Sequence, residues 1–375
     1  MTTARENLLR IFRHETPEWI PLTGHVDPYN QPNREGMDPE LAAALGTVQW
    51  CDESTVRFSR YLGLDIADYR GAPVRVTRRA VTVESREDGP DTIQTWHTPA
   101  GDLRQVRRRC REDGTSYLME HLVKTPDDLP RLAAVFEDET LAIDPPAVEI
   151  IRKRKELIGN DGILMCFTHG TPMGMMYREY SGVEALAYLY ADAPGALGDL
   201  FRVMERNYLR QFELSTQSGL DVLVTMDDTS TNTISPTMFE QFNMDCTDRR
   251  ADVCHRAGKL YFHHSCGLIH DLLSIYRRTR MDAVHAFTVP PVGNVTIAQG
   301  RPLLGNRITI FASVGAMADE QWDPVGVRAS IRQLYADAAP GDHFILGLAA
   351  FPHRTMAQTQ FVADVCREYR TLRAG

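Results

Sequence analysis

No run of about 18 consecutive apolar residues occurs in this sequence, so we expect no membrane-spanning helix. The apolar segment of a secretory signal is missing too, because the chain begins MTTARENLLRIFRHE, a charged amphipathic stretch. We therefore expect a cytoplasmic protein without a membrane partner.

Basic side chains are not in excess. The 41 lysines and arginines are outnumbered by 50 acidic residues, and the formal charge is −9. This balance argues against a broad phosphate-binding face for nucleic acid or an anionic membrane surface. The composition, 43% hydrophobic and 24% charged, is that of a globular protein. We expect this protein to bind a small-molecule substrate.

Cysteine is scarce, with seven residues in a chain of 375. An odd number spread from Cys51 to Cys366 does not suggest a disulfide framework and indicates buried or metal-ligating thiols. Most of them are expected to be plain core residues.

What the sequence does contain, from residue 160 onward, is an alternation of short apolar β-type runs with amphipathic helical stretches. This pattern is typical of a parallel sheet with helices outside it. Two further runs upstream would complete eight strands and close a (β/α)8 TIM barrel, a single domain over residues 1–375. The predicted strands are Ile20–Gly24, Leu64–Tyr69, Ile163–His169, Val222–Asp227, Lys259–Ser265, Ala283–Thr288, Ile308–Val314 and Phe344–Leu348.

Residues 73–125 have a different pattern. The segments VRVTRRAVTVES, DTIQTWHT and LRQVRRRC alternate polar with apolar residues and are bounded by the turn sequences EDGPD, PAGD and EDGT. They predict an antiparallel β insertion. Its many arginines are expected to form the solvated face of these strands rather than a ligand site.

Barrel enzymes carry their chemistry where the strands end and the βα loops begin. Polar residues at those points therefore crowd one rim of the predicted barrel. They are His25, His169, Asp227, Asp228, His263, His264, Cys266, His285 and, beyond the last strand, His353.

The segment KLYFHHSCG, residues 259–267, has the most specific pattern on this rim. Residues two apart on a strand face the same side, so His264 and Cys266 point together, while His263 faces away and is expected to be structural. An imidazole nitrogen and a thiolate are both good zinc ligands. The alternative is that His264 makes a hydrogen bond inside the barrel and Cys266 is a small buried hydrophobic residue.

Two adjacent carboxylates, Asp227 and Asp228, follow another predicted strand. They cannot both be buried without a cation or hydrogen-bond donors to offset their repulsion. We expect one of them to reach the pocket as a catalytic group. The alternative places Asp228 at a solvated turn and Asp227 against nearby backbone.

Isolated histidines stand at three other strand ends. His25, near Asp27, and His169 are candidate substrate contacts, and His353 could bind substrate or close a metal shell. As loop histidines, each has a purely structural alternative. Of the methionines that follow His169, Met173 is taken as a substrate contact, because such side chains more often line an apolar pocket than ligate a metal.

Six segments along the chain carry a family resemblance, namely RENLLRIFRHETPEWIPL, EHLVKTPDDL, YREYSGVEALAYLYADAP, DDTSTNTISPTMFEQF, FHHSCG and FTVPPVGNVTIAQGRPLLGNRITIFASVG. In this order they resemble the uroporphyrinogen decarboxylase superfamily, and within it the zinc-dependent cobalamin-linked methyltransferase branch. The resemblance runs nearly end to end and implies a (β/α)8 barrel. It also implies that His264 and Cys266 ligate zinc and that Tyr177 belongs to a pocket-lining helix.

The sequence departs from that branch near the last strand. Members that activate a thiol often have a further cysteine there, whereas this chain has Ala349, Ala350 and His353. With fewer thiolates the metal is a stronger Lewis acid and suits activation of a substrate oxygen better than activation of a thiol.

The resemblance and this departure together favour a demethylating methyltransferase. Zinc, held by His264, Cys266 and a third ligand from Asp227, Asp228 or His353, would polarise the ether oxygen of a small methoxylated substrate. A corrinoid (cobalamin) on a separate carrier protein would accept the methyl group. Because apolar helices outside a barrel commonly pair, a homodimer is a further expectation.

Two other functions stay open. One is a metal-independent decarboxylase or lyase that uses Asp227 or Asp228 as its acid/base group. It is less favoured because the N-terminal arginine clamp of the true decarboxylases is reduced to Arg34 in PLTGHVDPYNQPNREG. The other is a non-catalytic ligand-binding barrel.

Overall fold

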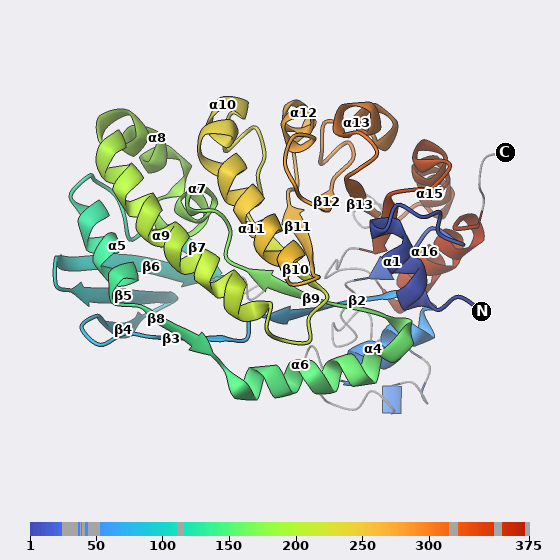
Figure 1. Ribbon diagram of the computed structural model, residues 1–375, viewed down its shortest axis with the longest axis horizontal. Helices are drawn as coiled ribbons and strands as arrows, with labels where there is room; N and C mark the ends of the chain where they lie inside the picture. Colours follow the sequence, from blue (N-terminus) through green and yellow to red (C-terminus); the bar gives the residue numbers. More distant parts are fainter. Residues whose placement is uncertain are drawn as a thin grey trace.

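The computed structural model describes residues 1–24, 37, 39, 42–43, 53–110, 116–314, 322–348 and 355–371. Its centre is a sheet of eight parallel strands bent into a nearly closed barrel, with helices around it (Figure 1). The two ends of the sheet meet where the backbone N–H of Asp65 donates to the carbonyl of Leu22 at 2.8 Å. The predicted (β/α)8 fold is confirmed.

The order of the strands around the barrel is their order in the chain. All eight predicted strands are present, each within two residues of its predicted bounds. They are β1 (Leu22–Gly24), β2 (Ile66–Gly71), β9 (Gly162–Thr168), β10 (Val222–Met226), β11 (Leu260–His264), β12 (Ala283–Phe287), β13 (Thr309–Val314) and β14 (Phe344–Leu348).

Helices cover the outside of the barrel and carry recognisable start signals. Thr355, for example, begins α16 with a capping box, since it and Gln358 each bond to the other's backbone. No helix in the described ranges is long and apolar enough to cross a bilayer. The main helices are α4 (Glu53–Tyr61), α5 (Asp128–Glu137), α6 (Pro145–Ile158), α8 (Gly182–Asp192), α9 (Pro194–Ser215), α11 (Met244–Arg256), α13 (Ile297–Leu304), α15 (Pro324–Ala338) and α16 (Met356–Tyr369).

Shorter turns of helix lie in the loops. Three are α-helical, namely α7 (Pro172–Met175), α10 (Pro236–Met238) and α12 (Leu273–Tyr276). Two are 3-10 turns, η1 (Gly159–Asp161) and η4 (His270–Leu272). The remaining two, η2 (Met176–Tyr180) and η3 (Phe239–Asn243), are π-helical, a form that is often found at functional sites.

The first helix, α1 (Ala4–Phe12), lies at the N-terminal end of the barrel, where Arg5 bonds to the carbonyl of Gly162 at the start of β9. Its Leu8 and Ile11 are fully buried against side chains that fill the barrel interior. A pocket is therefore expected at the opposite, C-terminal rim. The interior side chains are Ala67, Tyr69, Ile163, Met165, Val222, Val224, Phe262, Ala283, Phe311 and Ile345.

The predicted β insertion is confirmed, with one difference in pairing. Its main sheet is antiparallel, in the order β4 (Thr82–Asp88), β5 (Asp91–Thr98), β6 (Gly101–Arg109), β7 (Ser116–Glu120). The segment VRVTRRAVTVES is not one strand: β3 (Val74–Thr77) pairs instead with β8 (Thr140–Ile143), beyond residue 125. The break arises because Asp138 accepts the backbone N–H groups of residues 79, 80 and 81 and bends the chain.

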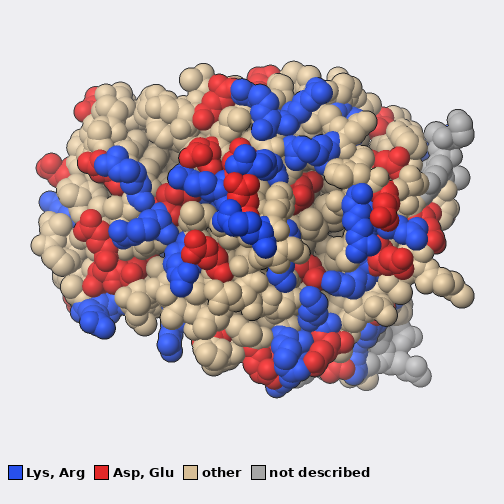
Figure 2. Space-filling model, in the orientation of Figure 1, with Lys and Arg blue, Asp and Glu red and all other residues tan. Residues whose placement is uncertain are grey.

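The arginines of the insertion lie mostly at its surface, as predicted. Arg108 pairs with Asp91 at 2.6 Å across β5 and β6, and Arg104 pairs with Glu120. Basic and acidic side chains are interspersed in the same way over the face in Figure 2. Such exposed pairs add little to stability, and their main effect is to keep the surface polar. The predicted EDGT turn falls outside the described residues.

Candidate metal centre

The ends of β10 and β11 bring three potential metal ligands together at the C-terminal rim. Met226 and His264 are partners in the parallel register of these strands, so the residues two positions further on, Asp228 and Cys266, leave the sheet side by side. One ligand atom each from Asp228, His264 and Cys266 lies within 4.8 Å of the other two. His264 and Cys266 thus face the same site.

Asp228 occupies the space between the other two ligands. One of its carboxylate oxygens, Oδ1, lies 2.8 Å from His264 Nε2 and accepts a hydrogen bond from Cys266 Sγ at 3.6 Å. The other, Oδ2, lies 3.1 Å from Nε of Arg178. The backbone of Asp228 has φ 50°, a left-handed conformation that is costly for a non-glycine residue and that often marks functional sites.

The charge state of this cluster follows from its contacts. Burial acts to raise the pKa of Asp228, but His264 and Arg178 outweigh it and leave that pKa below its usual range. Burial, with Asp228 alongside, raises the pKa of Cys266 to about 11, so the free thiol is protonated at neutral pH. A cation would favour the thiolate, because a coordinating thiol is deprotonated.

Imidazole, thiolate and carboxylate together are a donor set that Zn²⁺ accepts. These three residues offer one nitrogen, one sulfur and one oxygen atom from two adjacent strand ends. Three protein ligands with a position left over for water or substrate are typical of catalytic rather than structural zinc sites. The residues present therefore fit a catalytic zinc ion.

A chain of hydrogen bonds leads from His264 into the barrel. His264 Nδ1 lies 2.8 Å from Nδ1 of His285, and Nε2 of His285 lies 2.6 Å from the hydroxyl of Tyr69. His285 is 7% exposed and packs edge-on against Phe311. Because Nδ1 of His264 contacts His285, only Nε2 of His264 is directed at the cluster. A hydrogen bond to the second ring nitrogen is the usual way in which a metal-binding histidine is oriented.

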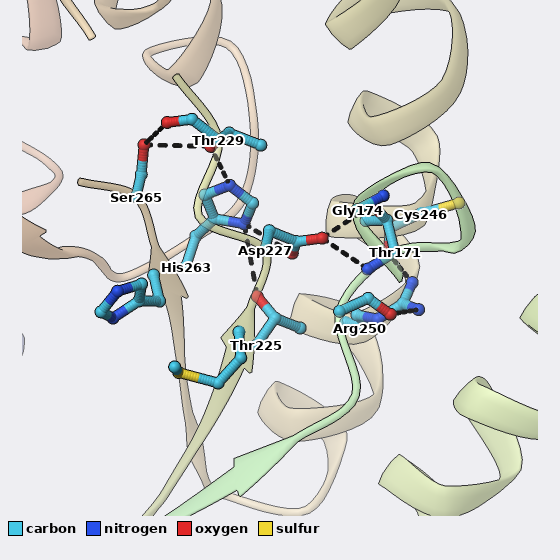
Figure 3. Close-up of polar contacts among 12 residues, drawn as sticks. Thr171, Gly174, Thr225, Asp227, Thr229, Cys246, Arg250, His263 and Ser265 are labelled. Atoms are coloured by element: carbon cyan, nitrogen blue, oxygen red, sulfur yellow. Dashed lines mark hydrogen bonds and ion pairs between the residues drawn. The ribbon is translucent and has the colours of Figure 1, made fainter. Parts of the chain in front are cut away.

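The neighbouring residues Asp227 and His263 belong to a separate, buried polar network (Figure 3). Asp227 Oδ1 accepts hydrogen bonds from the backbone N–H and the hydroxyl of Thr171, at 2.5 and 2.7 Å, and Oδ2 lies 3.4 Å from Nδ1 of His263. Burial lowers the pKa of His263 to about 4, so its ring is neutral. The hydroxyl of Thr229 bonds to the other ring nitrogen at 3.0 Å.

A pocket of about 330 Å³ opens beside the cluster at the same rim. Arg178 connects the two, since it lines the pocket and also contacts Asp228. His169 lies in the pocket wall, where its Nδ1 is 2.9 Å from Oε1 of Gln211 and its ring stacks on Tyr208. The lining residues are Ala72, Phe167, Thr168, His169, Met175, Arg178, Gln211 and Met226.

The other predicted substrate contacts have different positions. Met173 is 1% exposed and lies in the core, and Met175 lines the pocket. Tyr177 is 6% exposed, and its hydroxyl donates to the carbonyl of Asp227. Three further positions, His25, Asp27 and His353, fall outside the described residues.

Sequence reasoning did not single out Arg178, His285 or Gln211 as members of the site. His285 was recognised only as one polar residue among several at strand ends. Arg178 lies in the segment YREYSGVEALAYLYADAP, so a signal was present, but periodicity does not show that its side chain reaches back to β10. Gln211 lies on α9, 42 residues from His169, and no local pattern connects the two.

The fold and this cluster define a (β/α)8 barrel with a set of metal-binding side chains at its C-terminal rim. The sequence model of the uroporphyrinogen decarboxylase (URO-D) family matches residues 107–361. The chain belongs to that family. No curated protein matches the chain at a significant level.

Two solved structures are similar to nearly the whole chain. One, described as a methyltransferase from Methanosarcina mazei, has a TM-score of 0.63 and 14% identity and covers 98% of this chain and 99% of its own. The other is a B12-independent methionine synthase from Shewanella sp. W3-18-1 in complex with selenomethionine, with a TM-score of 0.49, 9% identity and coverage of 93% and 98%. At 14% identity, the likeness to the Methanosarcina mazei protein concerns the fold alone.

Proposed function

We propose that this protein is a zinc-dependent methyltransferase that removes the methyl group of a small methoxylated substrate and passes it to a corrinoid on a separate carrier protein. The observation that carries the proposal is the convergence of Asp228, His264 and Cys266 at the rim where barrel enzymes hold their active sites. Asp228 is the third ligand in this proposal, because Asp227 is turned into the buried network.

Zinc at this site would supply a Lewis acid that polarises the ether oxygen of the substrate. In this reaction the methyl C–O bond would break, the methyl group would pass to the reduced corrinoid, and the departing oxygen would keep the bonding electron pair and take a proton. The chain's own residues hold the substrate beside the cluster in the pocket lined by His169, Met175 and Arg178.

A metal-independent decarboxylase remains the alternative, since the family takes its name from one. In that function Asp228 is the acid/base group, and its low pKa makes it a carboxylate at neutral pH. The pocket argues against a substrate with many carboxylates, because Arg178 is the only charged side chain among those of its lining residues that the structure describes. A non-catalytic barrel would bind ligands in this pocket without turnover.

Metal content tests the proposal directly. Protein purified without chelator should contain about one zinc per chain. Cys266→Ser should lose zinc affinity by more than the roughly 10–100-fold that is lost when a residue hydrogen-bonded to a ligand is replaced. Cys110→Ser is the matched control, since Cys110 follows β6 in the insertion and should leave zinc binding unchanged.

Turnover separates the three functions. With methoxybenzoates as methyl donors and free cob(I)alamin as the acceptor, the wild-type protein should form methylcobalamin and Cys266→Ser should not. A wild-type protein that contains no zinc would rule out the methyltransferase. Decarboxylation that survives Cys266→Ser but not Asp228→Asn would establish the alternative, and ligand binding without turnover would indicate a non-catalytic barrel.

A further inference from the structure

The pocket beside the cluster has both apolar and polar lining residues, and these restrict the kind of ligand that it can bind. Four of its lining residues are apolar, namely Ala72, Phe167, Met175 and Met226. Phe167 is held flat against Tyr69, with ring centroids 4.6 Å apart and an interplanar angle of 8°, so it offers a fixed aromatic surface. These residues favour an apolar body in the ligand.

Several of the polar groups in the wall are already paired within the protein. Thr168 donates its hydroxyl hydrogen to the carbonyl of Val224 at 2.9 Å. Gln211 Oε1 accepts from both the backbone N–H and Nδ1 of His169, at 3.2 and 2.9 Å. Burial also lowers the pKa of His169, which makes its ring neutral. Thr168, Gln211 and His169 therefore supply no charge to a ligand.

Arg178 is different, because it is the only charged side chain among the lining residues that the structure describes. Its Nε lies 3.1 Å from Asp228 Oδ2, and Nη1 donates to the carbonyl of Met226. For Nη2, no hydrogen-bond partner is found among the described residues. The side chain is 26% exposed. Two contacts thus hold the guanidinium in place while one nitrogen is left for a ligand.

The turn that carries Arg178 is also held in place by contacts with neighbouring segments. It belongs to the π-helical turn η2, whose next residue, Glu179, pairs with Arg107 of the β insertion at 3.0 Å. The backbone N–H of Val123 donates to the carbonyl of Tyr180 at the end of the same turn, at 2.8 Å. A cation held in this way loses little conformational freedom when it binds an anion, which favours affinity.

From these observations we infer that the pocket binds a small, mostly apolar molecule that carries a single carboxylate, with the carboxylate on Arg178 and the apolar body against Phe167, Met175 and Met226. The inference rests on the proposed function, in which this molecule is the methyl donor. A volume of about 330 Å³ lies near the lower end of the range for small-molecule pockets and suits a one-ring acid rather than a tetrapyrrole.

Isothermal titration with matched probes tests this assignment. The probes are 2-, 3- and 4-methoxybenzoate and the corresponding methoxybenzamides, which have the same shape without the charge. At least one carboxylate should bind about tenfold or more tightly than its amide, because charge-assisted hydrogen bonds are roughly twice as strong as neutral ones. The titrations are made on protein with and without added zinc.

Substitutions in the pocket wall test where the carboxylate of the probe binds. Arg178→Met should abolish the preference for the carboxylate, and Arg178→Lys should keep part of it. Ala72→Asp leaves Arg178 and its structural contacts intact but adds a negative charge to the pocket, so it should weaken carboxylate binding and spare the amide. Arg202→Met, at an exposed position on α9, is the control that should change neither.

The results separate this inference from the proposed function. If amides bind as well as carboxylates, if no probe binds, or if Arg178→Met and Ala72→Asp both keep the preference, the inference is wrong even where zinc binding and methyl transfer are observed. If carboxylates bind through Arg178 in a protein that holds no zinc, the pocket assignment stands and the methyltransferase is wrong.

Discussion

His285 shows at the scale of single residues how the cluster is held ready for a metal. A neutral imidazole that binds a cation through Nε2 keeps its proton on Nδ1, and His264 Nδ1 lies 2.8 Å from Nδ1 of His285. His285 then accepts that hydrogen bond and carries its own proton on Nε2, toward the hydroxyl of Tyr69 at 2.6 Å. With zinc on Nε2, the two rings would hold His264 in the tautomer that zinc needs.

We therefore predict that His285→Phe lowers zinc affinity by about 10–100-fold, the range observed when a hydrogen-bond partner of a metal ligand is removed. Phenylalanine fills the same aromatic environment beside Phe311, so the fold should be retained. Tyr69→Phe, which removes only the hydroxyl, should have a smaller effect in the same direction. Competition with a chromophoric chelator measures both.

His255→Phe is the matched control for this experiment, because His255 lies on α11 and pairs with Asp282 away from the cluster. Equal zinc affinity in the wild type and in His285→Phe would show that His264 needs no such partner.

At the scale of elements, a bulge in β12 directs His285 to the cluster. The register between β12 and β13 shifts between His285 and Phe287, and the residue between them, Ala286, has φ 61°. Bulges of this kind are frequent next to active sites, where they re-aim a side chain. Left-handed backbone at Asp228 and Ala286 thus occurs on both sides of β11, at the rim that holds the proposed ligands.

A second feature at this scale is the close approach of the short helix α7 to Asp227. A Cβ atom at Gly174 would lie 2.4 Å from Asp227 Oδ1 and 3.2 Å from the hydroxyl of Thr171. Gly174→Ala should therefore destabilise the fold by about 1–3 kcal/mol, the usual cost of overpacking. Gly195→Ala on α9, where the new Cβ meets nothing within 4 Å, should be neutral or slightly stabilising. Urea unfolding of both variants is the measurement, and equal losses would show that the contact with Asp227 is not tight.

At the scale of the whole molecule, the sequence was sufficient for the barrel but not for the contacts across it. Strand positions could be predicted because an apolar β-type run identifies a buried strand wherever it lies, and the two-residue repeat aligned His264 with Cys266. The contact of Arg178 with Asp228 joins residues 50 positions apart and depends on how η2 packs on the rim. The pairing of β3 with β8 escaped prediction for the same reason, because it depends on the bend at Asp138 rather than on a pattern within either strand.

The same long-range contacts predict how a bound metal would act on stability. Asp228, His264 and Cys266 come from two strand ends that are 36 residues or more apart in the chain, and the unfolded chain has no preformed site. Zinc should therefore bind the folded protein far better and stabilise it by mass action, by about 2.7 kcal/mol at a free concentration one hundred times the Kd. Chelation should lower the midpoint of thermal unfolding, and added zinc should restore it. In Cys266→Ser, neither treatment should move the midpoint, whereas Cys110→Ser should respond like the wild type. A midpoint that moves equally in Cys266→Ser would place the stabilising zinc at another site.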